Sequence, residues 1–249
     1  MAEPRWGRTG GRLLRLAGHL LRGFWTILWR FPRLSVAQRN ALVQAWARGL
    51  LPRIGVQLQV RGTPPVNGPV LLVANHLSWL DIPVLHAARH CRFISKSDVD
   101  SWPLVATLAR AAGTLFIDRG SRRDTLRIVK LMSEALRAGD VLAVFPEGTT
   151  GDGGALLPFR ANLLEAAIGV NAPVQPLALR FIDPATGLDT PAPIYAGDTT
   201  LWTSIWRTLS APGIIARVEY GTPQRAQGRE RRSWARDLQL EVERLRHIA

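Results

Sequence analysis

Short apolar runs alternate with helical patterns after residue 52, and this alternation restricts the possible folds more than any other feature of the chain. Short runs bounded by turn residues are typical of strands buried on both faces of a sheet. Between them, residues 122–138 carry an apolar stripe at helical spacing. The alternation predicts an α/β layered domain, with a mixed, mostly parallel sheet flanked by helices. The expected strands are residues 56–60, 70–74, 92–94, 114–117, 141–145 and 174–179.

The start of the chain has a different pattern. Residues 11–30 place apolar side chains on one side of a helix and Arg and His on another, and Trp25 and Trp29 suit a lipid headgroup boundary. The charges that interrupt this segment argue against a secretory signal and against a membrane span, which needs roughly 18 or more apolar residues with few charges. The pattern therefore predicts an amphipathic helix at a surface.

A second helix is expected after the Phe-Pro pair at residues 31–32, which breaks the first. Ser35 and Gln38 have the spacing of a capping box at its start. Two basic, tryptophan-bearing helices predict a hairpin over residues 1–50 that lies in a membrane interface, followed by a catalytic domain over residues 51–249. An ordinary helical pair packed on the main domain fits the same pattern, and the sequence leaves both interpretations open.

Arginine carries nearly all of the formal charge of +13, since only Lys96 and Lys130 are lysines. So basic a chain predicts a polyanionic partner: nucleic acid, anionic lipid or a phosphorylated substrate. Cys91 is the single cysteine, so no internal disulfide forms and a reducing compartment is expected. Residues 183–212, rich in Pro, Gly and Thr, are expected to form a long surface excursion, and residues 229–247 a charged C-terminal helix.

The most informative segment is residues 70–83, VLLVANHLSWLDIP. It joins a buried strand to Asn75, His76, Ser78 and Asp81, at the strand end where α/β sheets place their sites. His76 and Asp81 would lie about 140° apart on a regular helix, so they meet only if the chain turns between them. A carboxylate bonded to one imidazole nitrogen leaves the other as a base, which predicts a His–Asp dyad without a protein nucleophile. A helix-capping Asp beside an unrelated surface His is the alternative.

Two further segments place charged residues just past expected strands. Residues 141–150, VLAVFPEGTT, end in a Pro–Glu–Gly turn that gives the Glu147 carboxylate a fixed direction. Residues 114–119, TLFIDR, put Asp118 and Arg119 after another strand. Taken singly, the first segment is equally a plain turn with a solvated Glu, and the second a surface ion pair.

Together these segments resemble the glycerolipid (lysophospholipid) acyltransferase family, of the bacterial 1-acyl-sn-glycerol-3-phosphate acyltransferase type. Residues 75–81, NHLSWLD, match the family's NHxxxxD block. Residues 116–119 (FIDR), 145–149 (FPEGT) and 172–176 (APVQP) are similar to its second, third and fourth blocks. Four blocks in the family's order, over about half of the chain, carry far more weight than one.

The resemblance implies an O-acyltransferase of phospholipid biosynthesis, in which His76 deprotonates the acceptor hydroxyl and Asp81 orients His76. Lys96 and Arg119 are implied to hold the acceptor headgroup, and residues 147–148 to shape its pocket. The expected donor is acyl-CoA or acyl-carrier protein as co-substrate, with no cofactor and no metal. The expected acceptor is 1-acylglycerol-3-phosphate, giving phosphatidate, and the expected location is among membrane lipids at the cytoplasmic face of the inner membrane. The residues implied in substrate binding are Asn75, Ser78, Lys96, Asp118, Arg119, Glu147, Gly148, Thr149, Thr150 and Arg160.

One position departs from the family pattern. Phosphatidate-forming members usually carry an arginine after EGT, where this chain has Thr150. The change removes a charge-assisted contact to phosphate. Either Arg160 replaces that contact, or the acceptor has a different headgroup, such as that of lyso-ornithine lipid.

Three rival interpretations come from other classes of protein. A nucleic-acid binder would explain the C-terminal arginines, but the chain has no helix-turn-helix, zinc-finger or RRM pattern, so no nucleic-acid partner is expected. A serine hydrolase could use Ser78, yet no G-x-S-x-G elbow exists. His86 and His90 have the i, i+4 spacing of metal ligands but lack the Glu of H-E-x-x-H and an evident third ligand, which favours a pair on a helix surface.

Overall fold

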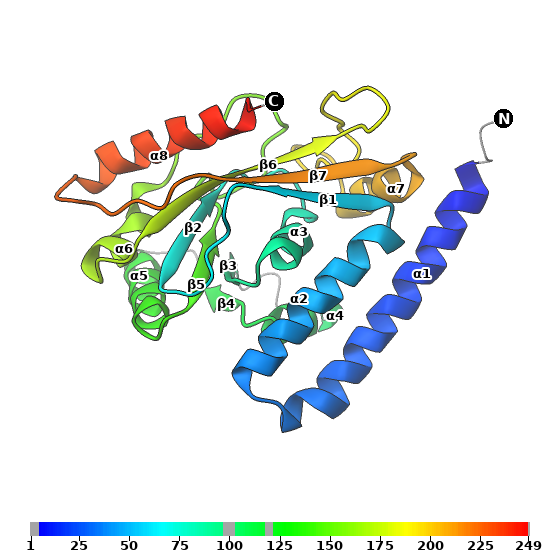
Figure 1. Ribbon diagram of the computed structural model, residues 1–249, viewed down its shortest axis with the longest axis horizontal. Coiled ribbons are helices and arrows are strands. Elements are labelled where there is room, and N and C mark those ends of the chain that lie inside the picture. The colour runs from blue at the N-terminus through cyan, green and yellow to red at the C-terminus, as the bar shows by residue number, and fades with distance from the viewer. Residues whose placement is uncertain (1–4, 97–102, 118–121, 249) are drawn as a thin grey trace.

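A seven-stranded sheet forms the centre of the molecule (Figure 1), whose computed structural model describes residues 5–96, 103–117 and 122–248. The strand order is β1-β7-β6-β2-β5-β3-β4. Only the β6–β7 pair is antiparallel, so β1 and β7 run against the other five strands. The predicted mixed, mostly parallel α/β sheet is confirmed. The strands are β1 (Val56–Arg61), β2 (Val70–Ala74), β3 (Arg92–Lys96), β4 (Leu115–Ile117), β5 (Val141–Val144), β6 (Val174–Ile182) and β7 (Ile214–Tyr220).

Helices cover both faces of this sheet, and an N-terminal pair extends beyond it (Figure 1). A π-helical turn (Thr26–Arg30) and a 3-10 turn (Phe31–Arg33) follow the first helix, and another 3-10 turn (Ala161–Leu164) precedes the sixth. The helices are α1 (Arg5–Trp25), α2 (Val36–Arg53), α3 (Asp81–Ala88), α4 (Pro103–Ala111), α5 (Arg122–Arg137), α6 (Glu165–Gly169), α7 (Leu201–Ser210) and α8 (Arg231–Arg246).

The excursion expected over residues 183–212 is wrong in part. It contains α7, which Thr200 caps by accepting a hydrogen bond from the Thr203 backbone. It is followed by β7, a strand that the sequence analysis did not predict, in which buried and partly buried residues alternate. The C-terminal helix is confirmed as α8.

β2 is the middle strand of the sheet, and all five of its residues are apolar and buried. Leu72 and Ala74 join a core cluster with α2, α3 and α7, whereas Leu71 and Val73 join a second cluster with α5, α6 and α8. Each side of the sheet is thus closed by its own set of helices. A strand buried on both faces needs the continuous apolar run seen in the sequence.

Parallel pairing determines which loops meet. Val73 is paired with Val144 of β5, and Ala74 with Leu177 of β6. The segments that follow β2 and β5 therefore leave the sheet at the same edge. Because β3 and β4 run in the same direction, their carboxyl ends face that edge as well. This is the edge at which open α/β sheets place their sites.

The N-terminal helices pack on the main domain along one side. α2 begins with the predicted capping box, and its Arg48 Nε donates to the Ala87 carbonyl of α3 at 2.8 Å. α1 lies against α2, with His19 stacked on Trp46 at 5.0 Å between ring centroids. Within the described part of the chain, no helix is long and apolar enough to cross a membrane.

Arg12 fastens α1 to the end of α7. Its buried guanidinium donates to the carbonyls of Leu209 (2.9 Å), Ala211 (2.5 Å) and Pro212 (3.2 Å). Burial lowers the pKa of Arg12. The guanidinium lies over Gly55, where a Cβ would come within 2.1 Å of it, and Gly55 has a φ of +82°. Glycine is therefore required at position 55 for two reasons: the backbone conformation and the lack of space for a side chain.

We expect Gly55→Ala to lower the free energy of unfolding by more than the roughly 1–2 kcal/mol that a left-handed residue costs by itself. Gly228→Ala is the matched control, because Gly228 has a φ of +81° but open space around its Cα. Chemical denaturation measures both variants. In double-mutant cycles, Arg12→Ala should change the free-energy cost of Gly55→Ala but not that of Gly228→Ala. Equal losses in the two glycine variants would contradict the close approach.

Candidate active site

A tight loop joins β2 to α3 and brings His76 onto Asp81. Asp81 Oδ2 accepts three hydrogen bonds, from His76 Nδ1 at 2.7 Å and from the backbone N–H groups of Leu77 (2.7 Å) and Ser78 (2.9 Å). The Asp81 side chain is fully buried, whereas that of His76 is 21% exposed. The expected turn between the two residues is present, and the helix-capping alternative fails because Asp81 is itself the first residue of α3.

The His76 ring is fixed by stacking as well as by Asp81. It lies parallel to Phe145, with 4.0 Å between centroids and 8° between planes, and Phe145 in turn stacks on Phe93 at 5.8 Å. Nδ1 is occupied by Asp81, which fixes the tautomer and leaves Nε2 as the basic nitrogen. A partly exposed imidazole held on two sides is arranged to accept a proton from a bound substrate.

Glu147 attaches the third sequence block to the first. Its Oε1 accepts from the backbone N–H of His76 at 2.8 Å, and its Oε2 accepts from that of Leu157 at 2.9 Å. The His76 carbonyl accepts from Gly151 at 2.7 Å, so the segment after β5 holds the His76 backbone from both ends. Glu147 therefore positions the base through Oε1, and its expected part in shaping the acceptor pocket stays a prediction. Burial raises the pKa of Glu147, and the two backbone hydrogen bonds oppose that shift.

Asn75 and Ser78 differ from the sequence-based prediction that they bind substrate. Both are fully buried. Asn75 exchanges hydrogen bonds with the backbone of Leu179 in β6, at 3.0 and 2.8 Å, as a continuation of the β2–β6 pairing. The Ser78 hydroxyl donates to the Pro193 carbonyl and accepts from the Leu80 N–H at 3.2 Å. Their polar atoms have protein partners, so they support the loop.

Residues 193–204 also support the catalytic loop, and the sequence analysis missed them. The Pro193 carbonyl accepts from Ser78 and, at 2.8 Å, from Ser204 of α7. Trp79 Nε1 donates to the Ser204 hydroxyl at 3.1 Å, and the Tyr195 N–H donates to the Leu77 carbonyl at 3.0 Å. The Thr200 cap followed by Trp202 and Trp206 one turn apart was a detectable signal for α7, hidden by the Pro and Thr content of the segment.

Arg160 lies beside the turn that follows β5. Its N–H donates to the Pro146 carbonyl at 2.9 Å. Gly148 has a φ of +77°, and a Cβ there would lie 2.5 Å from the Arg160 guanidinium carbon. Thr149 is exposed and Thr150 partly exposed on the same turn. These four residues of the predicted substrate-binding set are therefore brought together.

The remaining predicted substrate-binding residues follow β3 and β4. Lys96 is the last residue of β3, at the carboxyl edge of the sheet. Asp118 and Arg119 lie outside the described residues. The fourth block, residues 172–176, lies at the opposite edge, where Gln175 Nε2 donates to the carbonyls of Thr63 (2.9 Å) and Gly221 (2.8 Å). That block joins loops rather than contributing to the site.

The rival interpretations gain no support from the geometry. Ser78 is a poor nucleophile candidate because its hydroxyl is buried and bonded to Pro193. The His86–His90 pair is buried rather than on a helix surface, which lowers the pKa of His86 to about 3 and that of His90 to about 4. Throughout the described residues, no group of three or more metal-ligating side chains gathers.

The C-terminal basic patch is partly neutralised by ion pairs. Arg229 pairs with Asp237 at 3.4 Å, and Arg231 pairs with Glu165 at 2.9 Å. A solvated helix face explains these arginines.

A base with an orienting carboxylate and no adjacent protein nucleophile is suited to group transfer between two bound substrates. A family model described as Acyltransferase matches residues 56–180. The 1-acyl-sn-glycerol-3-phosphate acyltransferase of Neisseria meningitidis is 40% identical, over 73% of this chain and 71% of its own. The lyso-ornithine lipid O-acyltransferase of Pseudomonas aeruginosa is 35% identical, over 93% of this chain and 90% of its own. The chain belongs to the acyltransferase family and is an acyltransferase.

The fold agrees with this assignment. The crystal structure of the 1-acyl-sn-glycerophosphate acyltransferase PlsC from Thermotoga maritima superposes with a TM-score of 0.63, over 93% of this chain and 95% of the other, at 18% sequence identity. The likeness extends through the N-terminal helices as well as the sheet.

If His76 is the base, His76→Ala should lower turnover by a factor on the order of 10²–10⁴. Asp81→Asn should lower it by a comparable or smaller factor, because an amide holds the ring less well and in a different tautomer. Acyl-transfer assays measure both, and circular dichroism checks that the fold persists. A well-folded His76→Ala enzyme with full activity would refute the assignment.

Proposed function

We propose that this enzyme is a membrane-associated O-acyltransferase that moves an acyl chain from a thioester to the free hydroxyl of a lysolipid. The observation that carries the proposal is the His76–Asp81 dyad, held at the carboxyl edge of the sheet with Nε2 left as the base. The donor is acyl-CoA or acyl-carrier protein. No further cofactor is proposed, because a thioester and an alcohol already supply the electrophile and the nucleophile.

The dyad would act in two proton transfers. His76 Nε2 takes the proton of the acceptor hydroxyl as that oxygen attacks the thioester carbonyl carbon. The tetrahedral intermediate collapses, the carbon–sulfur bond breaks, and the thiol leaves with the proton held by His76. The ester and a free thiol result, and His76 returns to its neutral form. Asp81 stabilises the imidazolium between the two steps.

We propose 1-acylglycerol-3-phosphate as the acceptor, giving phosphatidate. Arg160 supports this choice because its guanidinium lies against the turn that carries Thr150, the position at which the usual arginine is missing. Lyso-ornithine lipid is the second candidate, favoured by Thr150 itself and by the relatives that act on that lipid.

Two substitutions distinguish these acceptors. Losing one charge-assisted hydrogen bond costs roughly 1.5–3 kcal/mol, about ten- to a hundredfold in acceptor affinity. Arg160→Ala should weaken the use of lysophosphatidate by that factor and leave lyso-ornithine lipid less affected. Thr150→Arg should improve lysophosphatidate use only if the site lacks a donor. The measurement is kcat/KM for each acceptor.

Arg137→Ala is the control for that comparison, since Arg137 is an exposed arginine at the far end of α5. If neither Arg160→Ala nor Thr150→Arg changes the preference between the two lipids, these positions do not recognise the headgroup.

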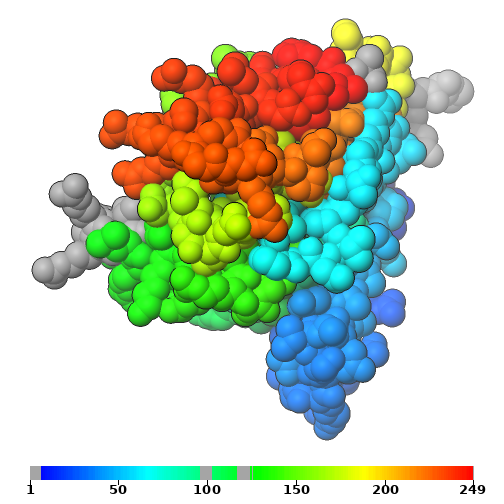
Figure 2. Space-filling view, turned by 60° about the vertical axis from the view of Figure 1, so that its left-hand side comes forward, coloured from blue at the N-terminus to red at the C-terminus, as the bar shows by residue number. Residues whose placement is uncertain are grey.

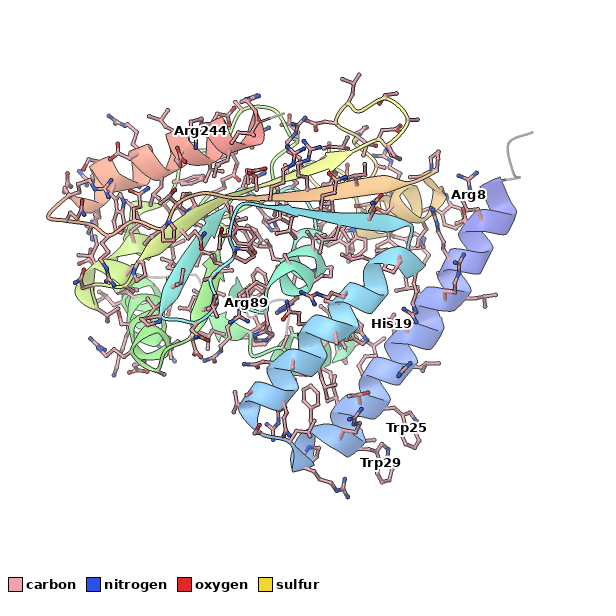
Figure 3. All side chains as sticks on the ribbon, in the orientation of Figure 1. Arg8, His19, Trp25, Trp29, Arg89 and Arg244 are labelled. Carbon is pink, nitrogen blue, oxygen red and sulfur yellow. The ribbon has the colours of Figure 1, made fainter. Side chains whose placement is uncertain are left out.

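We further propose that residues 1–50 form the membrane-interface module of the enzyme and residues 51–249 the catalytic domain, at the cytoplasmic face of the inner membrane. Along α1 and the π-helical turn that follows it, Leu14, Leu21 and Leu28 recur every seven residues and are exposed. Trp25 and Trp29 stack on each other and point away from α2 (Figure 3). The tip of the hairpin projects beyond the body of the molecule (Figure 2). An exposed apolar stripe with basic neighbours is suited to an anionic bilayer surface.

The triple change Leu14→Ser, Leu21→Ser and Leu28→Ser should weaken binding to anionic vesicles by about tenfold or more, because three buried contacts with lipid are lost. Its effect on unfolding should be small, since all three side chains are exposed. Vesicle sedimentation measures binding. Leu188→Ser and Leu240→Ser change exposed leucines elsewhere and serve as controls. Undiminished binding of the triple variant would contradict the role of α1.

A further inference from the structure

α7 presents two tryptophans outward. Trp202 is 64% exposed and Trp206, one turn later, is 39% exposed. Arg207 is exposed beside them, and the helix contains no acidic residue. The opposite face, which includes Ser204, is buried against the domain. Tryptophan rings with an apolar body and a polar N–H are characteristic of the headgroup region of a bilayer. Two on one helix face, unbalanced by acidic side chains, indicate a surface that meets lipid rather than water.

α7 packs against the N-terminal part of α1. The Thr9 hydroxyl donates to that of Ser210 at 3.2 Å, and Arg12 binds the last carbonyls of α7. A groove of about 760 Å³ is lined by Thr9 of α1, by residues 190–192 and by the second half of α7, which includes Trp206. Leu13, one helical turn after Thr9, is exposed on α1. Figure 1 shows α7 beside the N-terminal part of α1. The exposed Trp206 therefore lies in a groove that reaches α1.

We propose that α7 is a second membrane-docking element, which places Trp202 and Trp206 in the headgroup layer of an anionic phospholipid bilayer. This inference rests on the proposed function, in which the enzyme works on a lysolipid at a membrane. Charge complementarity specifies the bilayer: the chain has a formal charge of +13, and Arg207 extends from the docking face of α7. Anionic lipid attracts such arginines near its surface.

The docking helix is tied directly to the catalytic loop. Ser204 of α7 and Ser78 of the loop donate to one acceptor, the Pro193 carbonyl, and Trp79 donates to Ser204. The depth at which α7 settles in the headgroup layer therefore sets the depth of His76. The reacting hydroxyl of a lysolipid belongs to the same layer. Docking through α7 would bring the base to the level of its substrate.

A label placed on α7 tests this directly. Trp202→Cys, carrying an environment-sensitive fluorophore, is added to vesicles of phosphatidylglycerol and phosphatidylethanolamine. Cys91 is fully buried and does not compete for the label. Leu240→Cys is the matched control, because Leu240 is 65% exposed, on α8 at the opposite face of the sheet. We expect a blue shift and quenching by brominated lipid at position 202, and neither at position 240.

An aqueous spectrum at position 202 in protein that sediments with the vesicles would overturn the inference, and so would equal shifts at both positions. A second variant gives an independent measure: Trp202→Ser with Trp206→Ser should weaken vesicle binding by roughly tenfold. Unchanged binding of this double variant would also refute docking through α7.

The proposed function is tested separately. Acyl transfer by the wild-type enzyme to a short-chain lysolipid below its critical micelle concentration needs no bilayer. If the enzyme is active in this assay but the label at position 202 makes no contact with lipid, docking through α7 is refuted and the proposed function stands. If no acyl transfer occurs at all, the proposed function is refuted.

Discussion

The parallel pairing of β2 with β5 is the contact on which the site depends. It brings residues 75–81 and 145–151, more than sixty positions apart in the chain, to one edge of the sheet in matching register. Once they are adjacent, Glu147 and Gly151 bind the two backbone groups of His76, and Phe145 stacks on its ring. A slip of the β2–β5 register by one residue would turn each side chain to the other face and separate these partners. Burial of β2 on both faces makes such a slip costly.

Two buried carboxylates hold the base, and each relies on backbone N–H groups. Asp81 accepts from two of them in addition to His76, and Glu147 accepts from two. Burying a carboxylate is unfavourable unless hydrogen bonds replace the lost water. Directed N–H groups supply that replacement.

The central strands could be predicted from sequence alone because each is a short, continuous apolar run. The His–Asp pair could be predicted because His76 and Asp81 are only five positions apart, within one loop. The sequence analysis missed β7, although Ile214, Ala216 and Val218 alternate with less buried residues, because that pattern is weaker than a continuous apolar run. It assigned Asn75 and Ser78 to the substrate because their partners, Leu179 and Pro193, lie over a hundred residues away. Local patterns identify polar residues near a site but not what they bind; only the tertiary fold decides that.

The two hypotheses for the N-terminal hairpin are compatible, because they concern different faces. Gly23 lies so close to Trp46 that a Cβ would come within 2.6 Å of its ring, and this inner face packs on protein. The outer face, with Leu14 and Leu21, is exposed. Each helix of the hairpin is bound to an element that holds the dyad: α2 to α3, which begins at Asp81, and α1 to α7, which reaches the catalytic loop through Pro193. A base that must meet the hydroxyl of an amphiphile gains from such a linkage, because any surface that α1 contacts is then at a fixed distance from His76. Packing on the domain is thus what would allow a membrane-bound hairpin to position the chemistry.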